Sequence, residues 1–297
     1  MVGVGRLLFG TSGWSYDEWV GPVYDRGGKS KLAAYSKIFP TAEIDSTFYA
    51  YPSKGTVMGW LRYTNPDFVF TAKVPKLVTH EQMLDPEAGA DRDLKRFCDL
   101  MSPLALNGKL GCLLVQLPPR FNFDLDRLEA FLKIIPEDIR FAVEFRHISW
   151  VRPETIKLLK SFKVAYTIVD EPLLPPDALV SSDIAYVRWH GKGKRPWYNY
   201  RYSLDELKPW VEKVNAVSSK AKTVYGYFNN HYHGFAVENC AQMLELLGLA
   251  TPNQISMKTK VQNHLSGKAN SSQMRLDRLP ARQPVPTDEI QAHDRLQ

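Results

Sequence analysis

Short apolar and β-branched runs recur along the chain up to residue 229, and most of the segments between them carry apolar residues at helical spacing. The eight runs that predict strands are 7–12, 42–48, 68–74, 110–117, 140–145, 164–170, 184–190 and 223–229. Helical periodicity is present at 91–106, 125–135, 153–162, 204–218 and 237–247. This alternation predicts a parallel sheet, and eight units in about 250 residues predict an α/β fold of the TIM-like (β/α)8 class. An open doubly wound sheet is the alternative.

The pattern is irregular at two connections and at the end of the chain. Residues 171–183 contain three prolines and leave no room for a regular helix, and 76–90 predict a long loop. Beyond Ala250 the periodicity fades. We therefore expect a barrel domain over 1–250 and a basic C-terminal extension over 251–297 that is mobile or lies draped on the surface.

Composition supports a globular protein, because 44% of the residues are hydrophobic and 24% are charged. No uninterrupted apolar stretch is long enough to span a membrane, and the first residues lack the apolar region of a signal peptide, so we expect a cytoplasmic protein. Cys98, Cys112 and Cys240 are widely spaced and indicate reduced core thiols. The net charge of +6 favours a polyanionic partner, and half of that excess lies in 251–297.

Six motifs occur in an order that resembles the YecE-like barrel family, domain of unknown function 72. They are GTSGWSYDEW at 10–19, AEIDSTFY at 42–49, FTAKVPKLVTH at 70–80, LVQLPPRF at 114–121, VEFRHISW at 143–150 and GYFNNHYHGFA at 226–236. The resemblance covers about residues 6–248 and implies a TIM-like barrel with polar residues at its strand ends. It assigns no reaction, since one fold supports many functions.

Alternation of side chains along each strand predicts which residues point into the barrel. Charged residues that share a strand face must look inward, because the other face packs on helices. This reasoning places a polar group at or near the carboxyl end of seven strands: Glu43 and Asp45, Lys73, Gln116, Glu144, Asp170, Arg188 and His190, and Asn229. Chemistry in TIM barrels is built at that end, so we expect the site there. The alternative is a structural salt-bridge network that closes the barrel, above all for Glu43 and Arg188.

Aromatic and cationic residues follow several of these strands. The segment 192–202 interleaves the cations Lys192, Lys194, Arg195 and Arg201 with the aromatics Trp197, Tyr198, Tyr200 and Tyr202. Cations suit phosphates and flat rings suit unstacked bases. Trp14, Tyr16 and Phe48 follow the first two strands and extend the set of rings. A solvated basic loop is the simpler interpretation of 192–202, and carbohydrate binding is a further use of such rings.

Nucleotide-cradling and serine-hydrolase motifs are missing: the chain has no GxGxxG, GxxxxGK[ST] or GxSxG sequence. HExxH is also missing, so neither a redox cofactor nor a catalytic metal is predicted.

These residues favour a DNA-acting hydrolase without a cofactor, which we expect to be a monomer. The specific hypothesis is a base-excision glycosylase that flips a damaged pyrimidine into the barrel mouth and cleaves its N-glycosidic bond. Asp170 and Glu144, with Asp45 as third choice, supply the carboxylates. Lys73 neutralises charge or, if desolvated, attacks the sugar carbon and gives lyase activity.

The remaining candidates have binding roles in this hypothesis. Gln116 and Asn229 read the base edge, and Arg188 and His190 complete the polar ring. The stacking or wedge residues are Trp14, Tyr16, Phe48 and Tyr198. The contacts to the DNA backbone are Lys194, Arg195 and Arg201.

Two alternatives remain open. A metal-dependent sugar-phosphate isomerase or phosphodiesterase would use Glu144, Asp170, His190 and His231 as ligands. A nucleic-acid-binding adaptor without activity would use the polar ring only as structure and the C-terminal extension as a docking segment.

Overall fold

The structure, a computed structural model, describes residues 5–28, 30–194 and 196–276. Eight parallel strands close in chain order into a barrel, with β1 paired to both β2 and β8. The strands are β1 Arg6–Ser12, β2 Thr41–Ile44, β3 Val69–Lys73, β4 Leu110–Gln116, β5 Phe141–Glu144, β6 Ala165–Asp170, β7 Ile184–Trp189 and β8 Thr223–Phe228. The TIM-like fold predicted from the sequence is confirmed.

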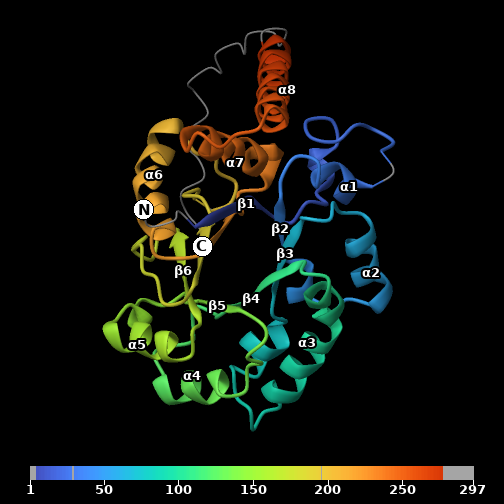
Figure 1. Cartoon of the computed structure of the whole chain (residues 1–297). Helices are drawn as coiled ribbons and strands as arrows, with labels where there is room; N and C mark the ends of the chain where they lie inside the picture. Colours follow the sequence, from blue (N-terminus) through green and yellow to red (C-terminus); the bar gives the residue numbers. More distant parts are fainter. Residues whose placement is uncertain (1–4, 29, 195, 277–297) are drawn as a thin grey trace, which may run out of the picture.

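Helices surround this barrel and follow most of its strands (Figure 1). They are α1 Lys31–Tyr35, α2 Lys54–Arg62, α3 Ala90–Leu106, α4 Leu125–Leu132, α5 Pro153–Ser161, α6 Leu204–Ser218, α7 Phe235–Leu246 and α8 Pro252–Leu276. The connection 171–183 contains no helix, as its prolines predicted. The long loop after β3 is interrupted only by the π-helical turn η3, Leu77–Glu81.

Side-chain caps fix where several helices begin. The Ser53 and Asp124 side chains accept hydrogen bonds from backbone N–H groups in the first turns of α2 and α4. At α6, Ser203 and Glu206 form a reciprocal capping box. These caps satisfy donors that a helix start leaves unpaired, so the strand-to-helix loops end at defined positions.

The barrel interior changes character from one end to the other. Apolar side chains fill its lower and middle part: Leu8, Val69, Cys112, Leu114, Ala142, Ala165, Ile184, Tyr186, Tyr225 and Tyr227. Tyrosine hydroxyls in this layer bond to Thr41 and Thr71, and the Tyr186 hydroxyl also lies 2.7 Å from a Glu43 carboxylate oxygen. Gly111 lies at a β-bulge, where a Cβ atom would come within 2.5 Å of the Tyr225 hydroxyl. The charged residues of the interior therefore lie above the tyrosines, at the carboxyl ends of the strands.

The described part of the expected C-terminal extension is a helix and not a mobile or draped segment, whereas residues 277–297 lie outside the described residues. Pro252–Leu276 forms α8, which begins beside α7 and then projects away from the barrel (Figure 1). Val261 of α8 is fully buried, and Met257 and Leu265 pack against the same core. Met257, Val261 and Leu265 are spaced four residues apart, as on one face of a helix. The polar residues between them made this periodicity hard to detect in the sequence. No described helix, α8 included, is long and apolar enough to cross a membrane.

Candidate active site at the barrel mouth

A cavity of about 490 Å³ opens at the carboxyl ends of the strands. Eight of the predicted site residues line it: Tyr16, Asp45, Phe48, Lys73, Gln116, His190, Tyr198 and Asn229. They come from the ends of β3, β4, β7 and β8 and from the loops after β1, β2 and β7. Its volume lies within the range of small-molecule sites, roughly 300–1,000 Å³. Strand alternation predicted five of these as converging polar groups, namely Asp45, Lys73, Gln116, His190 and Asn229, whereas Tyr16, Phe48 and Tyr198 were expected as stacking residues.

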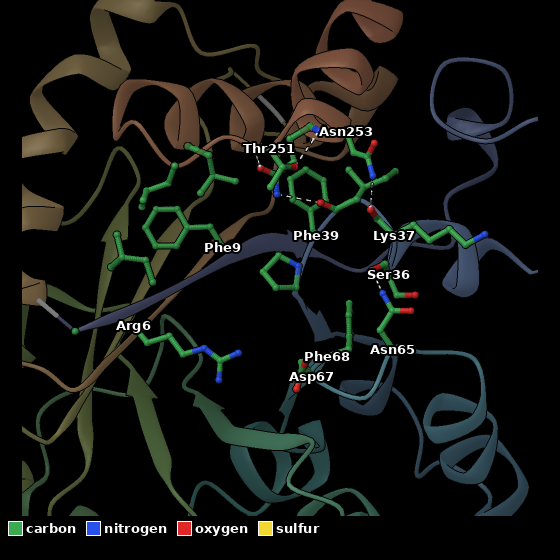
Figure 2. Close-up of a pocket in the computed structure, with 17 residues that line it drawn as sticks. Arg6, Phe9, Ser36, Lys37, Phe39, Asn65, Asp67, Phe68, Thr251 and Asn253 are labelled. Atoms are coloured by element: carbon green, nitrogen blue, oxygen red, sulfur yellow. Dashed lines mark hydrogen bonds between the residues drawn. The ribbon is translucent and has the colours of Figure 1, made fainter.

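A larger concavity lies at the opposite end of the barrel (Figure 2). Its volume is about 640 Å³, and it lies between the starts of β1, β2 and β3 and the segment that joins α7 to α8. Its walls include Phe9, Phe39 and Phe68, with Arg6 and Lys37 among its polar residues. None of the predicted site residues lines it. Because catalytic groups of TIM barrels lie at the carboxyl ends of the strands, the mouth cavity is the better candidate.

Beneath the mouth cavity, a chain of buried ion pairs links β2, β5, β6 and β7 or the residues that directly follow them. Arg188 donates to Glu43 and to Glu144, with each nitrogen–oxygen distance 2.6 Å. Arg146 contacts Glu144 and lies 2.6 Å from a carboxylate oxygen of Glu171. Each charge has a close partner of opposite sign, which a buried charge requires. This cluster of Glu43, Glu144, Arg146, Glu171 and Arg188 is called the ionic network below.

Glu144 belongs to the ionic network, whereas the sequence predicted a catalytic role for it. Its side chain is fully buried and does not line the cavity. One oxygen faces Arg188, and the other faces Arg146 and His190. Burial alone would raise the pKa of Glu144, but Arg146 and Arg188 hold it well below its ordinary value. The carboxylate therefore stays ionised, and both of its oxygens are engaged by neighbouring side chains of the protein. Arg188 is likewise buried among its partners, as the salt-bridge alternative predicted.

Asp170 does not point into the barrel, so this part of the prediction is wrong. Its neighbour in the sheet is Trp189, which stacks on Phe228 in the layer between strands and helices. The residue two before it, Ile168, packs in that same outer layer. Asp170 is 4% exposed and lies 3.7 Å from Lys192. The inward side chains of β6 are instead Ala165, in the interior cluster, Thr167, opposite the inward Tyr186, and Val169, opposite the inward Arg188.

Lys73 ends β3 and reaches the cavity from below. Its ammonium nitrogen lies 5.6 Å from the centre of the Phe48 ring. Among the described residues, none accepts a hydrogen bond from this nitrogen or forms an ion pair with it. Burial, and then the nearby charge of Arg188, lowers the pKa of Lys73 to about 8. A substantial share of the amine is therefore neutral near pH 7.5.

Asp45 follows β2 and supplies a carboxylate to the same cavity. It is partly exposed there, and the Tyr16 hydroxyl lies 3.3 Å from one of its oxygens. The hydroxyl also donates to the backbone oxygen of Ser12, which fixes its position. Asp45 forms no ion pair among the described residues, in contrast to Glu144. Of the three predicted carboxylates, only Asp45 is available to a bound molecule in the cavity.

Flat rings line one wall of the mouth. Tyr16 stacks on His231 with ring centres 4.3 Å apart and planes 6° apart. Tyr198 stacks on the same histidine at 5.7 Å. Trp14, by contrast, packs edge-on against Trp60 and does not line the cavity. The predicted ring platform is therefore built from Tyr16, His231 and Tyr198, without Trp14.

His190 is buried between the ionic network and the cavity. Its Nε2 atom lies 3.0 Å from Arg146, and its Nδ1 atom lies 3.0 Å from the Asn229 side chain. Burial, followed by Arg146 and Arg188, lowers the pKa of His190 to about 3, so the ring is neutral at pH 7. A guanidinium against Nε2 takes the place that a metal ion would need. Among the described residues, no group of three or more His, Cys, Asp or Glu side chains could hold a metal ion.

The cationic segment after β7 supplies fewer free charges than the sequence suggested. Arg201 forms a two-pronged ion pair with the buried Glu238, at 2.6 and 2.7 Å. Lys192 lies near Asp170, and Arg195 falls outside the described residues. Lys194 is exposed and forms no ion pair within the described part of the chain. It remains the best candidate for a phosphate contact in this segment.

Arg146 is the main residue that the sequence analysis missed. It lines the cavity and joins Glu144, Glu171 and His190. Arg146 lies two residues after the inward Glu144, so continuing the same alternation past the end of β5 would have identified it.

Comparisons with known proteins agree with the motifs. Residues 8–264 match the family described as "Protein of unknown function DUF72", which extends beyond the expected limit of 248 into α8. The UPF0759 protein YunF of Bacillus subtilis is 30% identical, over 84% of this chain and 99% of the relative. The UPF0759 protein YecE of Escherichia coli K12 is 32% identical over 48% of each chain.

Solved structures show the same relationship. A DUF72 family protein (TM1631) from Thermotoga maritima superimposes with a TM-score of 0.75 and 34% identity, over 82% of this chain and 99% of that one. A DUF72 family protein from Enterococcus faecalis gives a TM-score of 0.72 with 26% identity, over 83% of this chain and 97% of that one. The chain therefore belongs to the YecE-like DUF72 family.

Proposed function

We propose that this protein is a hydrolase that removes a damaged pyrimidine base from DNA by cleaving its N-glycosidic bond in the mouth cavity. One observation carries the proposal: the Asp45 carboxylate and the Lys73 amine, neither of which forms an ion pair among the described residues, share a cavity whose wall is a stack of flat rings. A flipped base needs rings to stack on, and its sugar needs an anionic group nearby.

Asp45 takes the role that was expected of Asp170 and Glu144. Cleavage of an N-glycosidic bond develops positive charge on the sugar, which a nearby carboxylate stabilises while water attacks. Asp45 is the predicted carboxylate that both lines the cavity and lacks an ion-pair partner among the described residues.

Gln116 and Asn229 suit recognition of the base edge. Both line the cavity and carry amide groups, which offer a donor and an acceptor together. Gln116 already accepts a hydrogen bond from Arg188 at 3.2 Å, and Asn229 contacts His190, so both amides are held in place. Fixed amides discriminate between bases better than mobile ones, because a mismatched edge leaves their polar groups unpaired.

The cavity suits a single flipped nucleotide better than a stretch of duplex. Its volume of about 490 Å³ and its position inside the barrel mouth exclude stacked base pairs. Flipping costs a few kcal/mol and costs least for a damaged or mismatched base, which itself contributes selectivity. Tyr49, beside the cavity and 72% exposed, is placed to fill the space that the base leaves.

The proposal includes DNA as the partner, a cytoplasmic location and action as a monomer. Lys194 is the described loop cation that is available to a phosphate. The net charge of +6 adds weaker, long-range attraction to a polyanion.

The test is base release from a panel of oligonucleotides that each carry one oxidised or modified pyrimidine. Asp45→Asn should lower the rate of release by about 100- to 10,000-fold, the usual contribution of a positioned acid or base. Asp138→Asn, at an exposed position before β5, is the matched control and should keep the rate. Release from no lesion by the folded wild-type protein would contradict the proposal. Release that stops on adding a chelator would favour the metal-dependent alternative.

A further inference from the structure

Lys73, which is partly exposed to the mouth cavity, differs from the buried Lys109 in what its nitrogen contacts. The Lys109 ammonium donates to the Thr64 backbone oxygen, the Thr64 hydroxyl and the Asn65 backbone oxygen, at 2.6–3.1 Å. The Lys73 nitrogen has no acceptor among the described residues and faces a ring instead. A structural lysine buried in a barrel is expected to be paired. The missing partner therefore indicates that the Lys73 amine serves a bound molecule.

The backbone around Lys73 holds the amine in place. The Thr47 hydroxyl donates to the Lys73 backbone oxygen at 2.7 Å, which ties the end of β3 to the loop after β2. The ring of Phe48 from that same loop covers the side chain. Asp45, at the start of the loop, lines the cavity beside it. The amine and a proton acceptor are thus carried by two adjacent strand ends.

Charge makes the amine reactive as well as accessible. Burial opposes protonation of Lys73, and the charge of Arg188 in the ionic network opposes it further. An amine must be neutral to attack carbon, and desolvation beside another cation is an established way to make a lysine nucleophilic. With a pKa of about 8, about a quarter of the amine is neutral at pH 7.5.

We propose that Lys73 forms an imine with the aldehyde carbon, C1′, of an abasic sugar in DNA, and so gives the protein lyase activity. The inference rests on the proposed function, because removal of the base is what produces this sugar. In this proposal Lys73 bonds covalently to the sugar and does not act only as a cation.

The steps balance without a redox partner. The neutral Lys73 nitrogen attacks C1′ of the ring-opened sugar, a C–N bond forms, and a proton passes from the nitrogen to the carbonyl oxygen. A second proton, supplied by water, reaches that oxygen, and the nitrogen lone pair then expels it as water and leaves a protonated imine. Asp45 accepts a proton from C2′, the electron pair forms a carbon–carbon double bond, and the 3′ phosphate leaves with the electrons of its bond to carbon. Water finally hydrolyses the imine and returns the free amine.

The experiment uses the full-length protein and an oligonucleotide with a preformed abasic site, treated with borohydride. Borohydride donates hydride to the imine carbon and converts it to a stable secondary amine. We expect a covalent protein–DNA adduct in which peptide mass spectrometry locates the sugar on Lys73. Lys73→Met should form no adduct above background. Lys157→Met, at an exposed position on α5, should form as much adduct as the wild type.

Three results would overturn the inference. They are no adduct with folded wild-type protein, an undiminished adduct in Lys73→Met, and trapping of free 2-deoxyribose 5-phosphate but not of abasic DNA. Thermal unfolding of Lys73→Met confirms that the variant is folded. Base release from the lesion panel, measured in parallel, separates the two proposals. Base release without an adduct overturns the role of Lys73 alone, and an adduct without base release supports it while the glycosylase proposal fails.

Discussion

At the residue scale, the mouth cavity separates side chains with similar chemistry into different roles. Glu144 and Asp45 are both carboxylates at strand ends, but the first is held by two guanidinium groups and the second faces the cavity. Lys109 and Lys73 differ in the same way. A buried charge with partners stabilises a fold, whereas a charge left without them is a candidate for chemistry.

The depressed pKa of Lys73 predicts a cost in stability that can be measured. The unfolded chain binds a proton at Lys73 up to about pH 10.5, whereas the folded chain releases it near pH 8. Below pH 8 the folded state therefore carries the full cost of a buried charge, and the cost disappears as the pH rises from 8 to 10.5. Lys73→Met, which keeps an apolar stem, should raise the free energy of unfolding at pH 7 by about 1–2 kcal/mol.

Chemical denaturation of wild type and Lys73→Met at pH 7 and pH 10 checks this prediction. The difference between the two proteins should shrink at the higher pH. A variant less stable than the wild type at pH 7 would mean that Lys73 has a stabilising partner.

The same ionisation predicts how imine formation depends on pH. Only the neutral amine attacks the sugar, so the rate of borohydride trapping should rise about tenfold per pH unit below 8 and level off above it. Initial trapping rates between pH 6 and pH 9.5 give the profile. A rate that stays constant over this range would contradict attack by Lys73.

At the scale of elements, the ionic network joins strands that are distant in the sequence. Arg188 on β7 reaches Glu43 on β2 and Glu144 on β5 across the barrel. Glu144→Gln replaces the carboxylate that pairs with Arg188 and Arg146 by a neutral amide, so both guanidinium groups lose a buried negative charge. The expected result is a loss of about 3–5 kcal/mol in the free energy of unfolding, the usual effect of breaking a buried pair.

Urea unfolding of Glu144→Gln tests whether the network is structural, with Glu137→Gln, exposed before β5, as control. A variant of normal stability that has lost base release would instead return Glu144 to the catalytic role that the sequence first suggested.

Helix α8 is the second element whose role can be tested. Val261 is fully buried, and Gln254 donates to the Ile38 backbone oxygen at 3.0 Å. Val261→Ala should lower the free energy of unfolding by about 2 kcal/mol through lost burial and the cavity left behind. Ser256→Ala, on the exposed side of α8, should change it little. Equal stability of the two variants would show that α8 packs only loosely on the barrel.

The elements also show where sequence reasoning succeeds. Alternation placed Lys73, Gln116, Arg188 and Asn229 correctly, because their strands have an apolar outer face and a polar inner one. On β6, both faces consist of uncharged residues until Asp170. The single charge was therefore assigned to the interior, whereas the register beside Trp189 places it on the outer face, near Lys192. No local pattern distinguishes these two outcomes.

At the scale of the whole molecule, the sequence predicted the closed barrel well, since eight repeated units leave few alternatives. It left open whether the converging groups form a site or a salt-bridge network, and it assigned Glu144 to the site. The pairing of Glu144 with Arg188 depends on a distance across the barrel between residues 44 positions apart. The division between ionic network and cavity therefore had to come from the structure.

The positive net charge of the whole molecule predicts that binding to DNA depends on salt concentration. If Lys194 contacts one phosphate, Lys194→Ala should reduce the slope of log affinity against log salt concentration by about 0.9. Arg201→Ala should instead lower stability, because it leaves the buried Glu238 without its partner. Titrations of a labelled abasic oligonucleotide at several salt concentrations give the slope. An unchanged slope for Lys194→Ala would remove this loop from the DNA-binding surface.

The most direct measurement is a crystal structure of the borohydride-trapped complex with an abasic oligonucleotide. We predict continuous electron density between C1′ of the sugar and the Lys73 nitrogen, with the sugar beside Asp45 in the mouth cavity and Tyr198 at its edge. Density for the sugar on a surface lysine, or in the concavity at the opposite end of the barrel, would contradict the assignment of the mouth as the active site.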